Sequence, residues 1–110
     1  AMFLATGQDE AQVVEGANAI TTAETTPEGG LYLSVSIASL EVGTVGGGTK
    51  LPTQAAGLEI LGVRGGGDPA GSNGDALAEA IAVGALAGEL SLLAALGSRH
   101  LSSAHADLGR

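Results

Sequence analysis

The sequence predicts one α+β unit: a helix, an antiparallel β-hairpin, a glycine-rich loop, and then mostly helix. Three observations lead to this prediction. Apolar and polar residues alternate over residues 31–37, which is typical of a strand with one buried face. Four glycines fall between residues 43 and 48, just after that alternation ends. Beyond the glycines, apolar residues recur at the spacing of one helix face.

The first residues predict a buried strand end followed by a capped helix. Residues 3–5 are apolar, and either Thr6 or Asp9 is placed to cap a helix over residues 10–16. Capping is the commonest role of an aspartate in such a place, and it competes with a catalytic role for Asp9. Both interpretations stay open at this point.

Two strands are expected next, over residues 19–25 and 31–37. The first contains Ile20 and several β-branched threonines, which favour extended backbone. Pro27 and the two glycines after Glu28 mark a turn between the segments. An antiparallel hairpin is the simplest pairing of these strands, with the alternating apolar residues of the second strand on its buried face.

Two helices are predicted after the glycine-rich loop. Thr49 is placed to cap the first helix, Pro52 suits its first turn, and Gly62 marks its end. The second begins at Asn73 or Asp75, runs to Gly97 with a break allowed at Gly84 or Gly88, and is apolar nearly all round. A helix of that kind is buried on most sides, so we expect other surfaces to cover it.

Small side chains dominate the apolar part of the chain. Among 110 residues there are 19 glycines, one Phe, one Tyr and no Trp. Each small side chain buries little apolar area, so a core built from them stabilises a chain of this length only marginally. We therefore expect partner surface, from other parts of the protein or from another subunit.

The charge balance is strongly acidic. Twelve acidic and four basic residues give a formal net charge of −8. This charge disfavours nucleic acid and anionic membrane surfaces as partners. With one lysine, Lys50, it indicates adaptation to high salt, where ions screen the self-repulsion. Thermal melting in low and in multimolar KCl tests this hypothesis, because equal or greater stability at low salt would contradict it.

No targeting, membrane-spanning or metal-binding pattern is expected. The first residues lack the basic start and the apolar length of a signal peptide. The longest uncharged apolar run, residues 80–88, is too short to span a bilayer. There is no cysteine, and His100 and His105 are poorly spaced for one helix face, so no metal site is expected. These features predict a cytoplasmic protein.

The glycine-rich stretch, residues 39–49, is the strongest candidate for a binding site. Consecutive glycines let backbone N–H groups approach a ligand closely, and a helix start nearby favours anions. Gly43 and Gly48 have the spacing of a P-loop, but Thr49 and Lys50 stand in the reverse of the required order. An ATP or GTP site is therefore rejected, and the stretch is either a phosphate-binding loop or a plain turn.

Four motifs follow one another along the chain. They are residues 5–9 (ATGQD), 40–49 (LEVGTVGGGT), 61–65 (LGVRG) and 87–92 (AGELSL). Together they resemble the C-terminal part of the 3-hydroxy-3-methylglutaryl-coenzyme A (HMG-CoA) reductase family, in the class that eukaryotes and archaea share. The acidic, lysine-poor composition suits a halophilic archaeon.

The resemblance implies reduction of HMG-CoA to mevalonate and CoA with NADPH. It puts the family's catalytic aspartate at Asp9, where a carboxylate holds a catalytic lysine charged. It puts at His105 the histidine that protonates the departing CoA thiolate, although spacing alone allows a surface histidine. The residues implied for cofactor binding are Gln8, Gly46, Gly47 and Gly48, and those implied for an apolar wall of the substrate pocket are Leu92 and Leu96.

The resemblance also makes residues 1–110 the C-terminal part of a larger catalytic domain. The family's catalytic Glu, catalytic Lys and second NADPH-binding motif precede this part, so we expect it to be inactive alone. Active sites of the family form between subunits, which implies a homodimer or a larger homo-oligomer. Two alternatives are a stand-alone nucleotide- or CoA-binding module and an alanine-rich dimerisation domain without catalysis.

Overall fold

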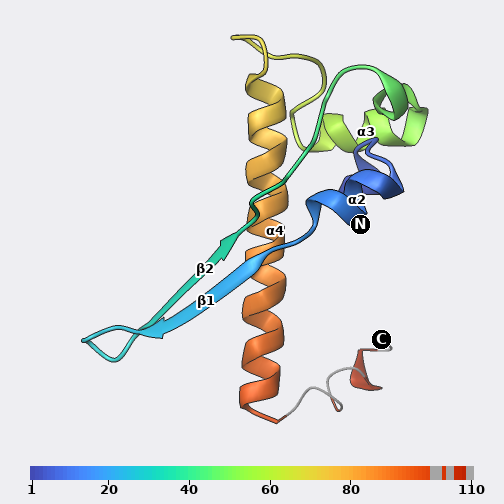
Figure 1. The fold of residues 1–110 in the computed structure, drawn as a ribbon. Coiled ribbons are helices and arrows are strands. Elements are labelled where there is room, and N and C mark those ends of the chain that lie inside the picture. The colour runs from blue at the N-terminus through green and yellow to red at the C-terminus, as the bar shows by residue number, and fades with distance from the viewer. Residues whose placement is uncertain (100–102, 104–105, 109–110) are drawn as a thin grey trace.

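The computed structural model describes residues 1–99, 103 and 106–108, and its elements after helix α1 follow the predicted order (Figure 1). The helices are α1 (Met2–Ala5), α2 (Glu10–Gly16), α3 (Pro52–Ile60) and α4 (Ser72–Gly97), with a short 3₁₀ helix, η1 (Gly47–Lys50), before α3. The strands are β1 (Ile20–Thr25) and β2 (Leu31–Ser36). This arrangement confirms the α+β prediction with one antiparallel hairpin.

The hairpin crosses α4 and extends away from the other helices. Its strands pair antiparallel, with Ile20 opposite Ser36 at the end near the helices. In Figure 1 the turn of the hairpin points away from α4, on the side opposite α2 and α3. The hydroxyl of Thr21 donates a hydrogen bond of 3.1 Å to Oε2 of Glu89, which ties β1 to the middle of α4.

A small apolar core joins α1, α3 and the first half of α4. Its buried side chains are Phe3, Leu58, Val63, Leu77 and Ile81. The partly buried side chains that pack against it are Met2, Val13, Leu40 and Val42. Since Leu40 and Val42 directly precede the glycines, the core also anchors the start of the glycine-rich loop.

The second half of α4 is largely uncovered by the described residues. Leu90 is 47% exposed, Leu93 39% and Leu96 50%, and the hairpin adds the exposed Ile20 and Leu31. The strand face that the sequence predicted to be buried is therefore only partly covered. Our expectation that other surfaces cover the long helix stays a prediction.

Helix α4 begins at Ser72, slightly before the predicted start, and ends at Gly97 as predicted. Among the described residues it is the one helix long and apolar enough to cross a membrane, judged by length and composition. The uncharged run over residues 80–88 is much shorter than α4 because Glu79 and Glu89 bound it, but an isolated acidic side chain does not end an apolar helix. Core helices of soluble proteins pass the same test, so the prediction of a cytoplasmic protein without membrane contact stays a prediction.

Two local predictions are wrong. The residues expected to form a strand end are helix α1, where the Thr6 hydroxyl donates 2.7 Å to the carbonyl of Met2. A short apolar run has no periodicity that separates strand from helix, which explains this error. Thr49 does not cap α3, because its hydroxyl donates to the carbonyl of Gly46 and the N-cap residue is Leu51. Pro52 begins α3, as predicted.

Candidate functional site

A cavity of about 1010 Å³ lies between the α1–α2 turn and the glycine-rich loop. The turn contributes Gln8 and Asp9 to its lining, and the loop contributes Gly46, Gly47 and Gly48. These residues belong to two motifs that are far apart in the sequence. The fold thus brings together the predicted catalytic aspartate and the predicted cofactor-binding residues around one space.

Asp9 caps helix α2 and also faces the cavity. Its Oδ1 accepts from the backbone N–H of Gln12 at 2.8 Å, and its own N–H donates to Oε1 of Gln12 at 2.9 Å. This reciprocal pair is a capping box, which confirms the predicted capping role. In the described part of the chain the second carboxylate oxygen has no hydrogen-bond partner, so it is available to a neighbouring group.

Gln8 is buried, and its side chain is fully engaged within the chain. Its Nε2 donates to the carbonyl of Gly43 at 2.7 Å and more weakly to that of Thr6 at 3.4 Å. Its Oε1 accepts from the N–H of Gly43 at 3.1 Å and from Nε2 of Gln12 at 3.1 Å. An amide has two donor hydrogens and two acceptor lone pairs, and all four are used. This hydrogen-bonding role within the chain was not predicted from the sequence, where Gln8 was expected only to contact the cofactor.

The glycine-rich loop is held internally while one of its faces stays open. Gly46 has φ of 80° and ψ of −179°, a conformation that essentially only glycine adopts. No atom lies within 4 Å of the positions that a Cβ on Gly46 or Gly47 would take. The Thr49 hydroxyl closes the loop on the Gly46 carbonyl, and the Thr44 hydroxyl donates to the carbonyl of Gly65. A ligand therefore has direct access to the loop backbone.

The turn and the loop touch backbone to backbone at Gly7 and Gly48. A Cβ on Gly7 would lie 2.6 Å from the nitrogen of Thr49, and one on Gly48 would lie 2.7 Å from the Gly7 oxygen. Real Cβ atoms essentially never approach other atoms so closely. Both positions therefore require glycine, which sets the separation between the Asp9 turn and the loop. Gly7 stood in a recognised motif, but its steric role was invisible in the sequence.

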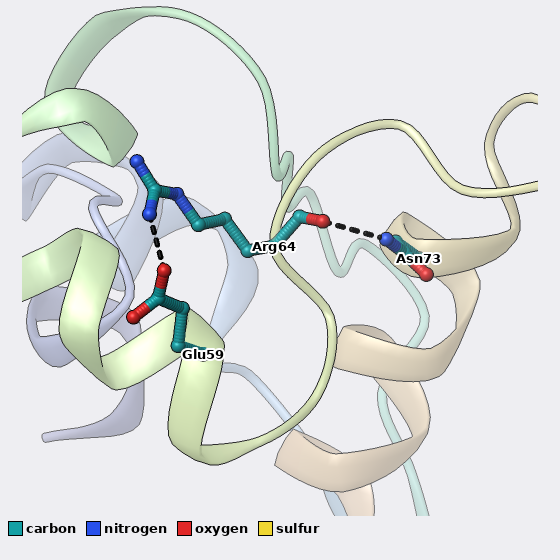
Figure 2. Close-up of polar contacts among 3 residues, drawn as sticks. All are labelled: Glu59, Arg64 and Asn73. Atoms are coloured by element: carbon teal, nitrogen blue, oxygen red, sulfur yellow. Dashed lines mark hydrogen bonds and ion pairs between the residues drawn. The ribbon is translucent and has the colours of Figure 1, made fainter.

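The segment between α3 and α4 supports the outer side of the loop. Nδ2 of Asn73 donates to the carbonyl of Arg64 at 3.0 Å and to that of Gly65 at 3.2 Å. The Arg64 guanidinium forms an ion pair with Glu59 on α3 (Figure 2). Since Gly65 also accepts from Thr44, the start of α4 and the glycine-rich loop share one set of contacts.

A sequence model described as hydroxymethylglutaryl-coenzyme A reductase matches residues 1–110. The chain belongs to this family. Over its full length it is 86% identical to the 3-hydroxy-3-methylglutaryl-coenzyme A reductase of Haloferax volcanii and 76% identical to that of Halobacterium salinarum, two halophilic archaea. It is 62% identical to the enzyme of that name from Pyrococcus horikoshii. The chain spans 27% of the length of each of these relatives.

Membership of the reductase family confirms the resemblance, but not every predicted site residue lies at the cavity. Leu92 and Leu96 lie on the second half of α4, 40% and 50% exposed, and they are not in the cavity lining. His105 lies outside the described residues. Within the described residues, no group of three or more His, Asp or Glu side chains is placed to hold a metal ion.

Proposed function

We propose that this chain is the C-terminal part of an HMG-CoA reductase that produces mevalonate and CoA with NADPH. One observation carries this proposal: Asp9 and the three consecutive glycines line the same cavity in a chain that matches the family along its whole length. The lysine and glutamate expected from the resemblance would come from other parts of the protein. We therefore expect residues 1–110 alone to have no reductase activity.

The glycine-rich loop is proposed to form part of the binding site of the nicotinamide cofactor. The cavity volume is at the upper end of the range for ligand pockets, about 300–1,000 Å³, as a dinucleotide requires. The absence of neighbours around the Cβ positions of Gly46 and Gly47 allows a flat ring or a phosphate to approach the backbone. A cofactor bound there supplies hydride. The preference for NADPH over NADH is carried over from the resemblance.

Asp9 is proposed to act through its second carboxylate oxygen. The first oxygen is fixed by the N–H of Gln12, so the carboxylate plane is set by the start of α2. A carboxylate held in this way keeps a neighbouring lysine protonated, and the lysine stabilises negative charge that develops on the carbonyl oxygen of the substrate. His105 is proposed to protonate the CoA thiolate. Loss of thioester reduction in His105→Gln, with mevaldehyde reduction spared, tests that role.

The decisive experiment is Asp9→Asn in the full-length protein, followed by NADPH oxidation in the presence of HMG-CoA. Asparagine caps helices about as well as aspartate, so α2 is retained while the charge is lost. We expect the rate to fall by roughly 10²–10³-fold or more, as for loss of other preorganised electrostatic groups. Glu15→Gln is the matched control, because Glu15 is exposed on the same helix and outside the cavity lining. A wild-type rate in Asp9→Asn would remove Asp9 from the mechanism.

A further inference from the structure

A continuous chain of hydrogen bonds joins Asp9 to the glycine-rich loop through two glutamine side chains. Gln12 exchanges two bonds with Asp9, of 2.8 and 2.9 Å, and its Nε2 donates to Oε1 of Gln8 at 3.1 Å. Gln8 in turn exchanges two bonds with the backbone of Gly43, of 2.7 and 3.1 Å. No other route of side-chain hydrogen bonds connects Asp9 to the loop in the described part of the chain.

The side-chain amide of Gln8 takes the place of a backbone hydrogen-bond partner for Gly43, the first glycine of the loop. Gly43 lies outside every helix and strand, and both of its backbone groups bond to the Gln8 side chain. Because Gln8 is only 6% exposed, water does not compete freely for these bonds. A buried amide with all of its partners in place has one orientation, so the position of Gly43 follows that of Gln8.

Gln12 controls both ends of this connection. Its backbone N–H and its Oε1 hold Asp9, while its Nε2 holds the Gln8 amide in the orientation that matches Gly43. The backbone contact between Gly7 and Gly48 sets how close the turn and the loop come. The glutamines set their relative orientation, because hydrogen bonds are directional and van der Waals contacts are not.

We propose that Gln8 and Gln12 are positioning residues that orient the glycine-rich loop relative to Asp9. The consequence for catalysis rests on the proposed function, in which the loop holds the cofactor and Asp9 serves the reaction. The mechanical coupling itself does not rest on it. Disturbing the bond between the two glutamines should therefore loosen the loop whether or not the protein is a reductase.

Gln12→Glu in the full-length protein isolates this bond. Glutamate at this helix position keeps an oxygen for the Asp9 N–H, so the capping box survives. A carboxylate cannot donate to Oε1 of Gln8, and two oxygens then face each other. We expect amide hydrogen exchange over residues 43–48 to accelerate by about fivefold or more, the equivalent of one lost hydrogen bond. The KM for NADPH should rise by a similar factor, while kcat stays within about twofold.

Two further variants separate positioning from charge and from general damage. Ala11→Glu adds the same charge at the neighbouring exposed position of α2 without touching either glutamine, and we expect wild-type exchange and kinetics. Gln12→Met removes the bonds to both Gln8 and the Asp9 N–H. We expect it to lower kcat as well as to raise the KM, because Asp9 then loses part of its own support.

The outcomes divide cleanly between the two proposals. Exchange and KM in Gln12→Glu that equal those in Ala11→Glu would overturn the positioning role. A fall in kcat with unchanged KM and unchanged exchange would also overturn it, since the effect would then bypass the loop. Faster exchange in a protein that oxidises no NADPH with HMG-CoA would support the positioning role and refute the proposed reductase function.

Discussion

The two halves of helix α4 differ in their surroundings in a way that their compositions do not predict. In the first half Leu77 and Ile81 are 0% and 6% exposed, whereas in the second half Leu90 and Leu96 are 47% and 50% exposed. Each half has four alanines, but the first half has one leucine and the more exposed second half has five. The first half packs against the core around α1 and α3, the hairpin crosses the middle of the helix, and the second half extends beyond both (Figure 1). Burial along this helix is therefore decided by its neighbours and not by its composition.

The packed and the exposed parts of the molecule also differ in whether they lie at the cavity. The core lies next to the turn and loop that line the cavity, so its packing holds the candidate site in place. We expect a surface outside the described residues to cover the exposed apolar side chains of the second half of α4. The chain spans only 27% of the length of its Haloferax and Halobacterium relatives. This small fraction supports the proposal that such a surface exists in the whole protein.

The largest expected effect is on the packed half of α4. Leu77→Ala in the full-length protein should lower the free energy of unfolding by about 2–5 kcal/mol, the usual cost of a cavity in a core. Urea denaturation followed by circular dichroism measures it, with Leu90→Ala as the matched variant. A loss below about 1 kcal/mol at Leu77 would contradict its place in the core. An equal loss at Leu90 would show that other parts of the protein bury the second half.

A smaller loss is expected where α3 crosses α1. A Cβ on Gly57 would lie 2.4 Å from the carbonyl oxygen of Ala5, a rigid backbone atom. Gly57→Ala should therefore cost about 1–3 kcal/mol through overpacking, despite the better helix propensity of alanine. The shift in melting temperature measures this cost. An unchanged or higher melting temperature would mean that the two helices separate easily.

The smallest effect, and one of opposite sign, is expected in the exposed half of α4. No atom lies within 4 Å of the Cβ position at Gly88, which is in the helix interior. Gly88→Ala should therefore stabilise the helix by about 0.5–1 kcal/mol, because glycine has more backbone freedom to lose. The melting temperature again provides the measurement. Destabilisation would indicate that another segment packs closely on this face in the full-length protein.

Short-range sequence patterns predicted most of the helices and strands. The two errors arose where such a pattern was too short or ambiguous. The cap at Asp9, the helix that follows and the turn between the strands depend on residues within one turn of each other, and all three are confirmed. The error over residues 2–5 arose because four apolar residues have no decisive period. Thr49 has the right chemistry for a cap, but the N-cap residue of α3 is Leu51, two residues later, and the Thr49 hydroxyl instead donates to the carbonyl of Gly46.

The candidate site was predictable as a set of motifs and not as an arrangement. Motif order pointed to Asp9 and to the glycines, and the structure places them around one cavity. The partnership of Gln8 with Gly43 was not predictable, since a glutamine amide accepts many partners and these two residues are 35 positions apart. Leu92 and Leu96 were assigned to a pocket wall, and their position away from the cavity leaves that role a prediction.

The sequence by itself determined the order of helices and strands after helix α1, the cap at Asp9, the hairpin and the membership of a reductase family. Each depends on side chains close together in the chain or on short sequence motifs that can be recognised without the structure. Tertiary structure alone decided which half of α4 is buried, why Gly7 and Gly48 have no room for a side chain, and how Gln8 and Gln12 connect Asp9 to the loop. These depend on contacts between distant segments, which form only when the apolar core brings those segments together.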